Sequence, residues 1–179
     1  MSGTRPLLQQ GRAFTLIETM VVVALVAILG AVAVPGFRDL LVNQRLAATS
    51  TDFVASLSLA RAEAIRHSRW VTLLPRNRDW SNGWEVATTD SEGNPVVLRA
   101  FDALRTGIAV DPQYGEGFNR FVSYDAGGFS RSRTGSFLAG CLTFKADTGR
   151  RSAIVLSASG RPRVCDPGKK GDCAGACGT

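Results

Sequence analysis

Histidine is almost absent from this sequence, because His67 is the only one among 179 residues. The chain also lacks the short motifs that indicate common catalytic or nucleotide-binding sites, namely G-x-S-x-G, the phosphate-binding P-loop and a C-x₂-C redox pair. We therefore expect neither catalysis nor a bound cofactor. His67 itself is predicted to lie at the end of a helix, where it caps the helix or faces solvent.

Cysteine is missing from the first 140 residues, and all four cysteines lie in the last 39: Cys141, Cys165, Cys173 and Cys177. An even number behind an export-like N-terminus predicts two disulfides formed in an oxidising compartment, with three pairings open. The alternative is a four-cysteine zinc site. The gaps of 23, 7 and 3 residues lack the C-x₂-C pairs of such a site, so we expect no metal.

Acidic residues are scarce near both ends of the chain, whose formal net charge is +6. Residues 1–13 contribute +2 from Arg5 and Arg12, whereas residues 150–179 contribute +4 from six cations and two aspartates. The net charge of residues 14–149 is therefore zero. Any binding of anions is therefore expected in the C-terminal tail.

Charge is nearly absent from the segment Phe14 to Val34, in which Glu18 is the only charged residue among 21. As a helix this segment is about 31 Å long, close to the ~30 Å hydrocarbon core of a bilayer. A carboxylate held at mid-bilayer costs about 2.5–3.5 kcal/mol or more. A cleaved signal peptide, with "AVA" at Ala31 to Ala33 as its cleavage site, accounts for the apolar run, as does a plain signal anchor. Neither accounts for Glu18.

The stretch "AFTLIE" followed by this apolar run resembles the N-terminus of type IV prepilins and type II secretion pseudopilins. The resemblance implies cleavage by prepilin peptidase between Ala13 and Phe14 and N-methylation of Phe14. Pro35 matches the proline that kinks the family's helix, and Glu18 matches its acidic residue. The residue before the cleavage site is usually glycine in the family, and Ala13 departs from that pattern.

The resemblance also gives Glu18 a physical role in assembly with other pilins. In a filament of such helices, the carboxylate can meet the positively charged amino terminus of a neighbouring subunit. Two buried charges are then paired only when the subunit is in register. The N-terminal segment implies insertion in the inner membrane, with the rest of the chain in the periplasm and later in a pilus or pseudopilus at the cell surface.

A second helical pattern runs from Phe37 to Ser68 without proline or glycine. An apolar stripe recurs at helical spacing, comprising Val42, Leu46, Phe53, Leu57, Ala60 and Ala64. We expect this helix to continue the membrane helix with a bend at Pro35.

Eight short runs rich in β-branched and aromatic residues follow the helix, beginning at Trp70, Gly83, Pro95, Gly107, Arg120, Gly135, Arg151 and Arg161. A long helix followed only by strands predicts an α+β fold with antiparallel sheet. The segment 115–140 between them is rich in glycine and is expected to be a mobile loop or hairpin.

The block "LARAEAIRHSRWVTLLPRNRDWSNGWEV" resembles the helix end and first hairpin of the FimT/GspH group of minor pilins and pseudopilins. The implied organisation is a leader (1–13), a filament-core helix (14–35), its amphipathic continuation (36–68) and a β-rich head (69–179). A minor pilin that primes a type IV pilus, at or near its tip, is the favoured function. A structural pseudopilin of the type II secretion system is the alternative.

The tail "RRSAIVLSASGRPRVC" predicts a β-hairpin that turns at Ser159 and Gly160. Arg161 and Arg163, two residues apart on one strand, would project about 7 Å apart from one face, near the spacing of phosphates along a nucleic-acid strand. "GRPR" resembles the G-R-x-R stretch with which FimT-type minor pilins hold DNA during uptake in natural transformation. We expect double-stranded DNA to bind there, or the arginines to be merely solvated. The other candidate contacts are Arg150, Arg151, Lys169 and Lys170.

Overall fold

The computed structural model describes residues 14–111, 118, 120–132 and 134–173. The chain divides into two compact units, residues 1–38 and 39–179. A single α-helix, α1 (Leu16–His67), begins in the first unit and ends in the second, and it continues across Pro35 without interruption. Among the described residues, the strands all lie in the second unit, and from here on the word head means this whole unit, residues 39–179.

Within the head, the residues of α1 that were expected to face a sheet are buried. The stripe Val42, Leu46, Phe53, Leu57, Ala60 and Ala64 is at most 7% exposed. These residues form one hydrophobic core with residues from both sheets. The helical spacing therefore identified the buried face of the helix correctly.

In the described part of the chain, eight strands follow α1, one in each segment where the sequence predicts one. They are β1 (Val71–Pro75), β2 (Trp84–Thr89), β3 (Pro95–Phe101), β4 (Ile108–Val110), β5 (Val122–Tyr124), β6 (Gly140–Ala146), β7 (Arg151–Leu156) and β8 (Pro162–Cys165). Two short 3₁₀ helices, η1 (Arg76–Arg78) and η2 (Trp80–Asn82), connect β1 to β2.

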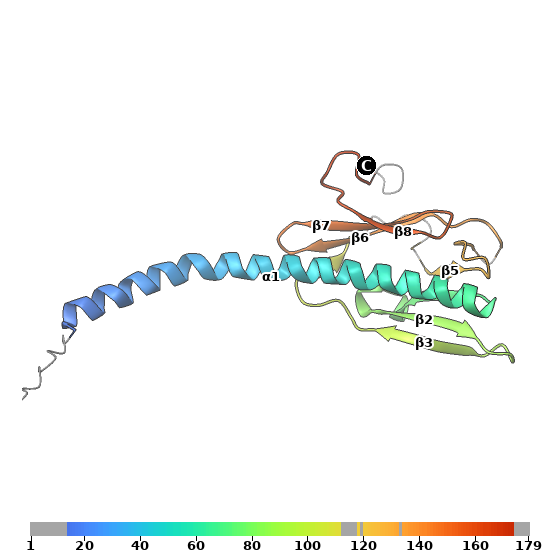
Figure 1. The fold of residues 1–179 in the computed structure, drawn as a ribbon, viewed down its shortest axis with the longest axis horizontal. Coiled ribbons are helices and arrows are strands. Elements are labelled where there is room, and N and C mark those ends of the chain that lie inside the picture. Colours follow the sequence, from blue (N-terminus) through green and yellow to red (C-terminus); the bar gives the residue numbers. More distant parts are fainter. Residues whose placement is uncertain (1–13, 112–117, 119, 133, 174–179) are drawn as a thin grey trace, which may run out of the picture. The chain divides into compact units, whose positions relative to one another are not determined.

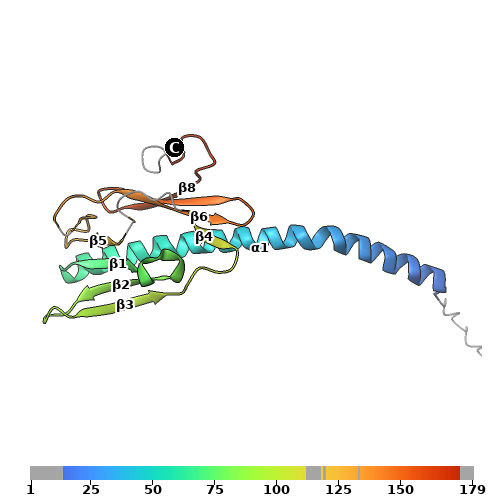
Figure 2. The same ribbon diagram turned by 180° about the vertical axis from the view of Figure 1, so that it is seen from behind.

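The strands form two four-stranded sheets, and every pairing is antiparallel. The first sheet has the order β3-β2-β1-β5 and the second the order β4-β6-β7-β8. Figures 1 and 2 show the two sheets on two sides of the head portion of α1. The predicted α+β fold, with a long helix packed on antiparallel sheets, is confirmed.

The centre of the core is aromatic. Phe53 of α1 is fully buried and makes edge contacts with the rings of Trp80, Trp84 and Phe144 at centroid distances of 5.3, 5.0 and 5.6 Å. The indole of Trp80 donates a 2.6 Å hydrogen bond to the carbonyl oxygen of Phe118. One helical side chain thus joins both sheets, and edge-to-face pairs of this kind add about 0.5–1.5 kcal/mol each beyond area burial.

The glycine-rich segment 115–140 differs in part from the mobile loop that its composition suggested. Phe118, Val122, Tyr124 and Ser130 are fully buried, and β5 completes the first sheet by pairing with β1. Phe118, Val122 and Tyr124 belong to the hydrophobic core, whereas Phe129 and Phe137 stay exposed. Composition alone does not show which of them point inward.

Candidate filament helix and basic hairpin

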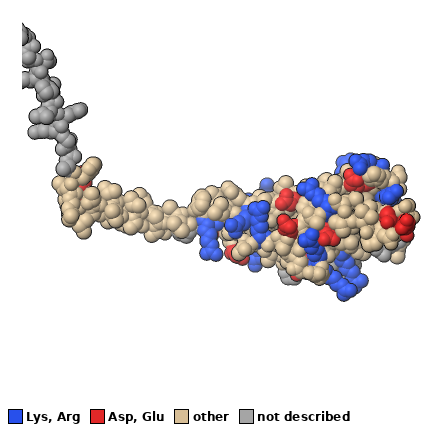
Figure 3. Space-filling model, turned by 90° about the horizontal axis from the view of Figure 1, so that it is seen from below, with Lys and Arg blue, Asp and Glu red and all other residues tan. Residues whose placement is uncertain are grey.

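The N-terminal portion of α1 presents a continuous apolar surface to solvent. Large side chains such as Leu16, Ile17 and Leu29 are 79%, 67% and 68% exposed, and the candidate membrane window is 0% buried. Figure 3 shows this part of the helix almost free of charged side chains, which gather on the head instead. By length and composition this helix could cross a membrane. An apolar helix that buries nothing against its own chain requires an apolar environment or partner helices.

Glu18 lies in the first turn of α1 and is the one charged residue between Phe14 and Phe37. Its backbone N–H donates to the Thr15 hydroxyl at 3.3 Å, and Thr19 donates its hydroxyl to the carbonyl of Leu16 at 2.8 Å. A carboxylate in the first turn interacts favourably with the positive end of the helix dipole. Within the described part of the chain the Glu18 carboxylate has no ion-pair partner. Ala13, the predicted cleavage position, lies outside the described residues.

The basic hairpin is the β7–β8 pair, with Leu156 opposite Pro162 and Ala153 opposite Cys165. Its turn forms where the sequence predicts it. The backbone N–H and the hydroxyl of Ser157 donate to the carbonyl oxygen of Arg161, and the same hydroxyl accepts the backbone N–H of Arg161. Arg161 and Arg163 are both exposed. A guanidinium nitrogen of Arg163 donates to the carbonyl oxygen of Asp172 at 2.8 Å, which holds this side chain in place.

The structure does not gather the six predicted DNA contacts in one place. Ser157 comes six positions after Arg151 along an extended chain, which is about 20 Å at 3.4 Å per residue, and Arg161 lies opposite Ser157. Arg150 and Arg151 line a pocket of about 290 Å³ together with Asp166 and Asp172, and Arg151 pairs with Asp111 at 3.2 Å.

A disulfide joins Cys165 at the end of β8 to Cys173 and closes the loop that carries Lys169 and Lys170. Cys141 is also disulfide-bonded, and none of the described cysteines is free. Cys177 lies outside the described residues. This buried disulfide therefore holds the end of β8 against the loop that follows it.

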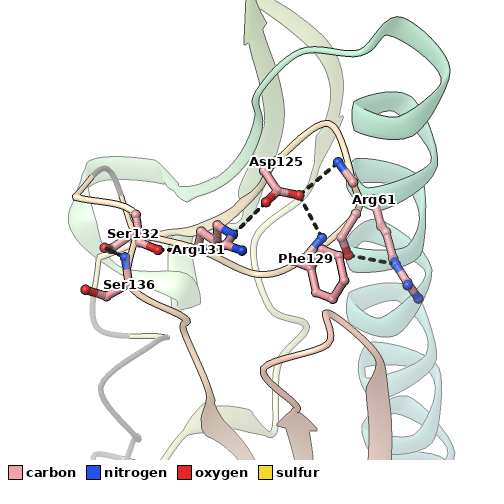
Figure 4. A network of polar contacts seen from close by, with 9 residues as sticks. Arg61, Asp125, Phe129, Arg131, Ser132 and Ser136 are labelled. Atoms are coloured by element: carbon pink, nitrogen blue, oxygen red, sulfur yellow. Dashed lines mark hydrogen bonds and ion pairs between the residues drawn. The ribbon is translucent and has the colours of Figure 1, made fainter.

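The sequence did not reveal an ordered network around Asp125, which follows β5. One carboxylate oxygen accepts the backbone N–H groups of Gly127 and Phe129 at 2.9 Å, and the other accepts from Arg131 at 2.7 Å (Figure 4). Arg61 of α1 donates to the carbonyl of Gly128 at 2.9 Å. The sequence signal is Asp125 two residues before Gly127, because such an aspartate accepts hydrogen bonds from its own turn.

Behind this network lies Tyr124, whose side chain is fully buried. Burial raises the pKa of the Tyr124 hydroxyl, and the charge of Arg61 opposes part of that rise. Gly160 of the β7–β8 turn approaches the same ring, since a Cβ there would lie 2.9 Å from Cε1 of Tyr124. The turn that carries Arg161 is thus packed directly against the Asp125 network.

His67 ends α1 and is exposed, and its Nε2 lies 3.2 Å from an oxygen of Glu63. Among residues 14–111, 118, 120–132 and 134–173, no group of three or more histidine, cysteine or acidic side chains could hold a metal ion.

Residues 49–160 match the protein family described as "Type II transport protein GspH", and residues 9–34 match the "Prokaryotic N-terminal methylation motif". The chain belongs to the GspH family. It is a minor pilin or pseudopilin, and members of this class assemble with other pilins. The resemblance carried by "AFTLIE" and by the helix-end block is confirmed.

Solved structures of two minor pilins or pseudopilins are similar in fold. The type IV minor pilin FimU of Pseudomonas aeruginosa PAO1 is 17% identical, with a TM-score of 0.57 over 71% of this chain and 92% of FimU. A second crystal form of FimU gives 0.54 at the same identity, over 69% and 95% of the two chains. The minor pseudopilin EpsH of the Vibrio cholerae type II secretion system is 13% identical, with a TM-score of 0.52 over 70% and 99%. No curated protein sequence matches this GspH-family chain.

Proposed function

We propose that this GspH-family chain is a minor pilin that primes a type IV pilus at or near its tip. The observation that carries the proposal is the exposed apolar surface of α1 with one carboxylate, Glu18, in its first turn. Prepilin peptidase cleaves after Ala13 and Phe14 becomes methylated. Residues 14–35 then hold the subunit in the inner membrane, with residues 69–179 in the periplasm until assembly.

Glu18 specifies assembly in this proposal. An unpaired carboxylate in the apolar layer is costly, and the amino terminus of a neighbouring Phe14 supplies the opposite charge. Transfer of the helix from the bilayer into the filament is therefore favourable only at a position where Glu18 can pair with that amino terminus. Pro35 lies at the end of the segment that enters the filament core.

Processing is tested by the intact mass of the protein extracted from membranes. The proposal requires the mass of a chain that starts at methylated Phe14. A start at Val34, as expected of a signal peptide cleaved after "AVA", would contradict it.

Assembly is tested by the amount of the protein in sheared filaments from cells that express Glu18→Gln. We expect this variant to stay in the inner membrane, because the neutral amide cannot pair with the amino terminus. Asp52→Asn is the matched control, since Asp52 is an exposed acid on the head portion of α1. Normal incorporation of Glu18→Gln would refute the role of this carboxylate.

The alternative is a structural pseudopilin of the type II secretion system, which the family description and the likeness to EpsH favour. Deleting the gene distinguishes the two machines. Loss of surface pili with normal protein secretion supports the pilus, whereas retained secreted proteins and normal pili support the pseudopilus.

Binding of double-stranded DNA is a second proposed function, and the exposed pair Arg161 and Arg163 on the basic hairpin supports it. The disulfide loop holds Arg163 through the carbonyl of Asp172, so less side-chain freedom is lost when a phosphate is bound. Lys169 and Lys170 are exposed on the same loop. Arg150 and Arg151 contribute less in this proposal, because aspartates surround them.

This function is tested with the full chain in an uncharged detergent, titrated against labelled duplex at several salt concentrations. If about four phosphates are neutralised, the log–log slope of affinity against salt is near −3.6. Arg161→Gln/Arg163→Gln should lose the binding, whereas Arg78→Gln/Arg120→Gln removes the same charge from exposed positions elsewhere. Absence of binding at low salt, or equal loss in both variants, would contradict the proposal.

A further inference from the structure

Two exposed phenylalanines and one arginine form an aromatic platform beside the basic hairpin. The platform consists of Phe129, Arg131 and Phe137, which come together because Arg131 and Phe137 form a short antiparallel bridge. The rings of Phe129 and Phe137 meet edge to face at 6.0 Å and 71°. They remain 42% and 55% exposed, which is unusual for large apolar side chains in contact with each other.

The platform is held rigidly. The guanidinium of Arg131 lies 4.1 Å from the ring centroid of Phe137 and 5.9 Å from that of Phe129. Asp125 and the carbonyl of Gly135 accept hydrogen bonds from the same guanidinium at 2.7 and 2.8 Å (Figure 4). Arg131 lies over the Phe137 ring, yet the side chain of Phe137 is still 55% exposed.

The platform is adjacent to the turn that carries Arg161. The backbone of Gly160 packs against the carbonyl of Gly128, and a Cβ there would lie 3.3 Å from the nitrogen of Ser130. Gly128 and Ser130 are the two neighbours of Phe129 in the chain. The backbone on both sides of Phe129 therefore lies against the turn that carries Arg161.

We propose that this platform stacks on unpaired bases, so that the head prefers single-stranded DNA to duplex DNA. The inference rests on the proposed binding of phosphates by Arg161 and Arg163, and it adds the class of nucleic acid that this site selects. Arginines that contact only phosphates bind both forms of DNA. An open aromatic face adds binding energy only when a base face is free to cover it.

Bases within a duplex cannot stack on this platform, because each base face is covered by the neighbouring base pairs. In a single strand the bases can rotate out and lie on the rings while the backbone follows the cations. Asp125 neutralises the charge of Arg131, so the platform contributes stacking, and Arg161 and Arg163 contribute the attraction for phosphate.

The test compares two labelled probes on the full chain in an uncharged detergent: the 30-nucleotide strand dT30 and a closed circular duplex plasmid without ends. Phe137→Ala should weaken binding of dT30 by about fivefold or more, and it should change binding of the duplex by less than about twofold. Phe137→Trp should retain the preference for dT30. Val97→Ala, at a position of similar exposure (52%) on β3, should change neither affinity.

Fluorescence of the Phe137→Trp variant gives a second measurement that does not depend on the folding of an alanine variant. Stacking on a base should quench the added indole with dT30 and leave it unchanged with the duplex. Equal affinity for both probes in the parent chain, or equal effects of Phe137→Ala on both, would overturn the platform and leave phosphate binding standing. Absence of binding to either probe would overturn both proposals.

Discussion

The backbone of Gly160 in the β7–β8 turn lies directly against the carbonyl oxygen of Gly128, in the loop that follows β5. The contact joins the two sheets at the end of the head where α1 finishes, because Gly128 also accepts a hydrogen bond from Arg61. Any side chain at Gly160 would collide with this carbonyl and with the Tyr124 ring. The position of the basic turn therefore depends on a glycine.

Gly160→Ala should destabilise the head by about 2–5 kcal/mol, since the left-handed backbone costs about 1–2 kcal/mol and overpacking about 1–3 kcal/mol. Gly149→Ala is the matched control. Gly149 has a similar φ of +86°, against +77° at Gly160, with nothing within 4 Å of its Cβ position, so only the backbone cost of about 1–2 kcal/mol applies. The measurement is denaturant unfolding of the full chain in detergent, and equal losses would show that the contact with Gly128 is unimportant.

Phe53→Ala should lower the free energy of unfolding of the head by about 3–5 kcal/mol, because the ring is fully buried among aromatic side chains from both sheets. Val97→Ala, on the exposed strand β3, should change it by less than about 0.5 kcal/mol. Near-ultraviolet circular dichroism during unfolding reports both values. A loss below about 1 kcal/mol for Phe53→Ala would mean that the core can close around the missing ring.

Cys165→Ser/Cys173→Ser should destabilise the head by about 2–3 kcal/mol, the value that loop-closure entropy gives for so short a loop. Reducing agent also breaks the disulfide of Cys141 in both chains, so reduction should cost the parent chain about 2–3 kcal/mol more than it costs the variant. Thermal unfolding with and without reductant measures the difference. An unchanged midpoint in the serine variant would show that β8 stays in place without the cystine.

Asp90→Asn should destabilise the β2–β3 turn in a pH-dependent way. The backbone N–H of Asn94, then its side-chain amide, and the backbone N–H of Glu92 donate to the carboxylate, and they lower the pKa of Asp90 below its usual 3.8. A lowered folded-state pKa stabilises the fold above the unfolded value, and this stabilisation disappears as the pH falls through the folded value. The difference in unfolding free energy between parent and variant should therefore shrink below pH 3.8, and a constant difference from pH 6 to pH 2 would contradict the explanation.

Much of the fold follows from patterns within short segments. The spacing of Val42, Leu46 and Phe53 identified the buried face of α1, and β-branched runs between glycine, proline and asparagine located every strand. These predictions succeed because side-chain periodicity on a helix or a strand is a local property. The order of the strands in the two sheets was not predicted, because it depends on pairings such as β1 with β5, between segments almost 50 residues apart.

The same difference between local patterns and contacts of distant segments applies to the candidate sites. The apolar helix that contains Glu18 and Pro35 could be predicted because one continuous run of apolar residues indicates it. The basic tail was predicted as one site, yet the antiparallel register sends Arg151 and Arg161 to opposite ends of the hairpin. Arg131 was expected in a mobile loop or hairpin. It lies in a short antiparallel bridge, where Asp125 and two phenylalanine rings hold its side chain.

Local sequence thus determined the elements of this GspH-family chain, the exposed apolar helix and the location of its net positive charge, because each depends on residues close together in the chain. The fold decided which cysteines pair, which arginines form ion pairs with aspartate carboxylates, and that the loop carrying Phe129 lies against the β7–β8 turn. The physical reason is that these relationships join residues on different strands and loops. Only the packing of both sheets around Phe53 brings those strands and loops together.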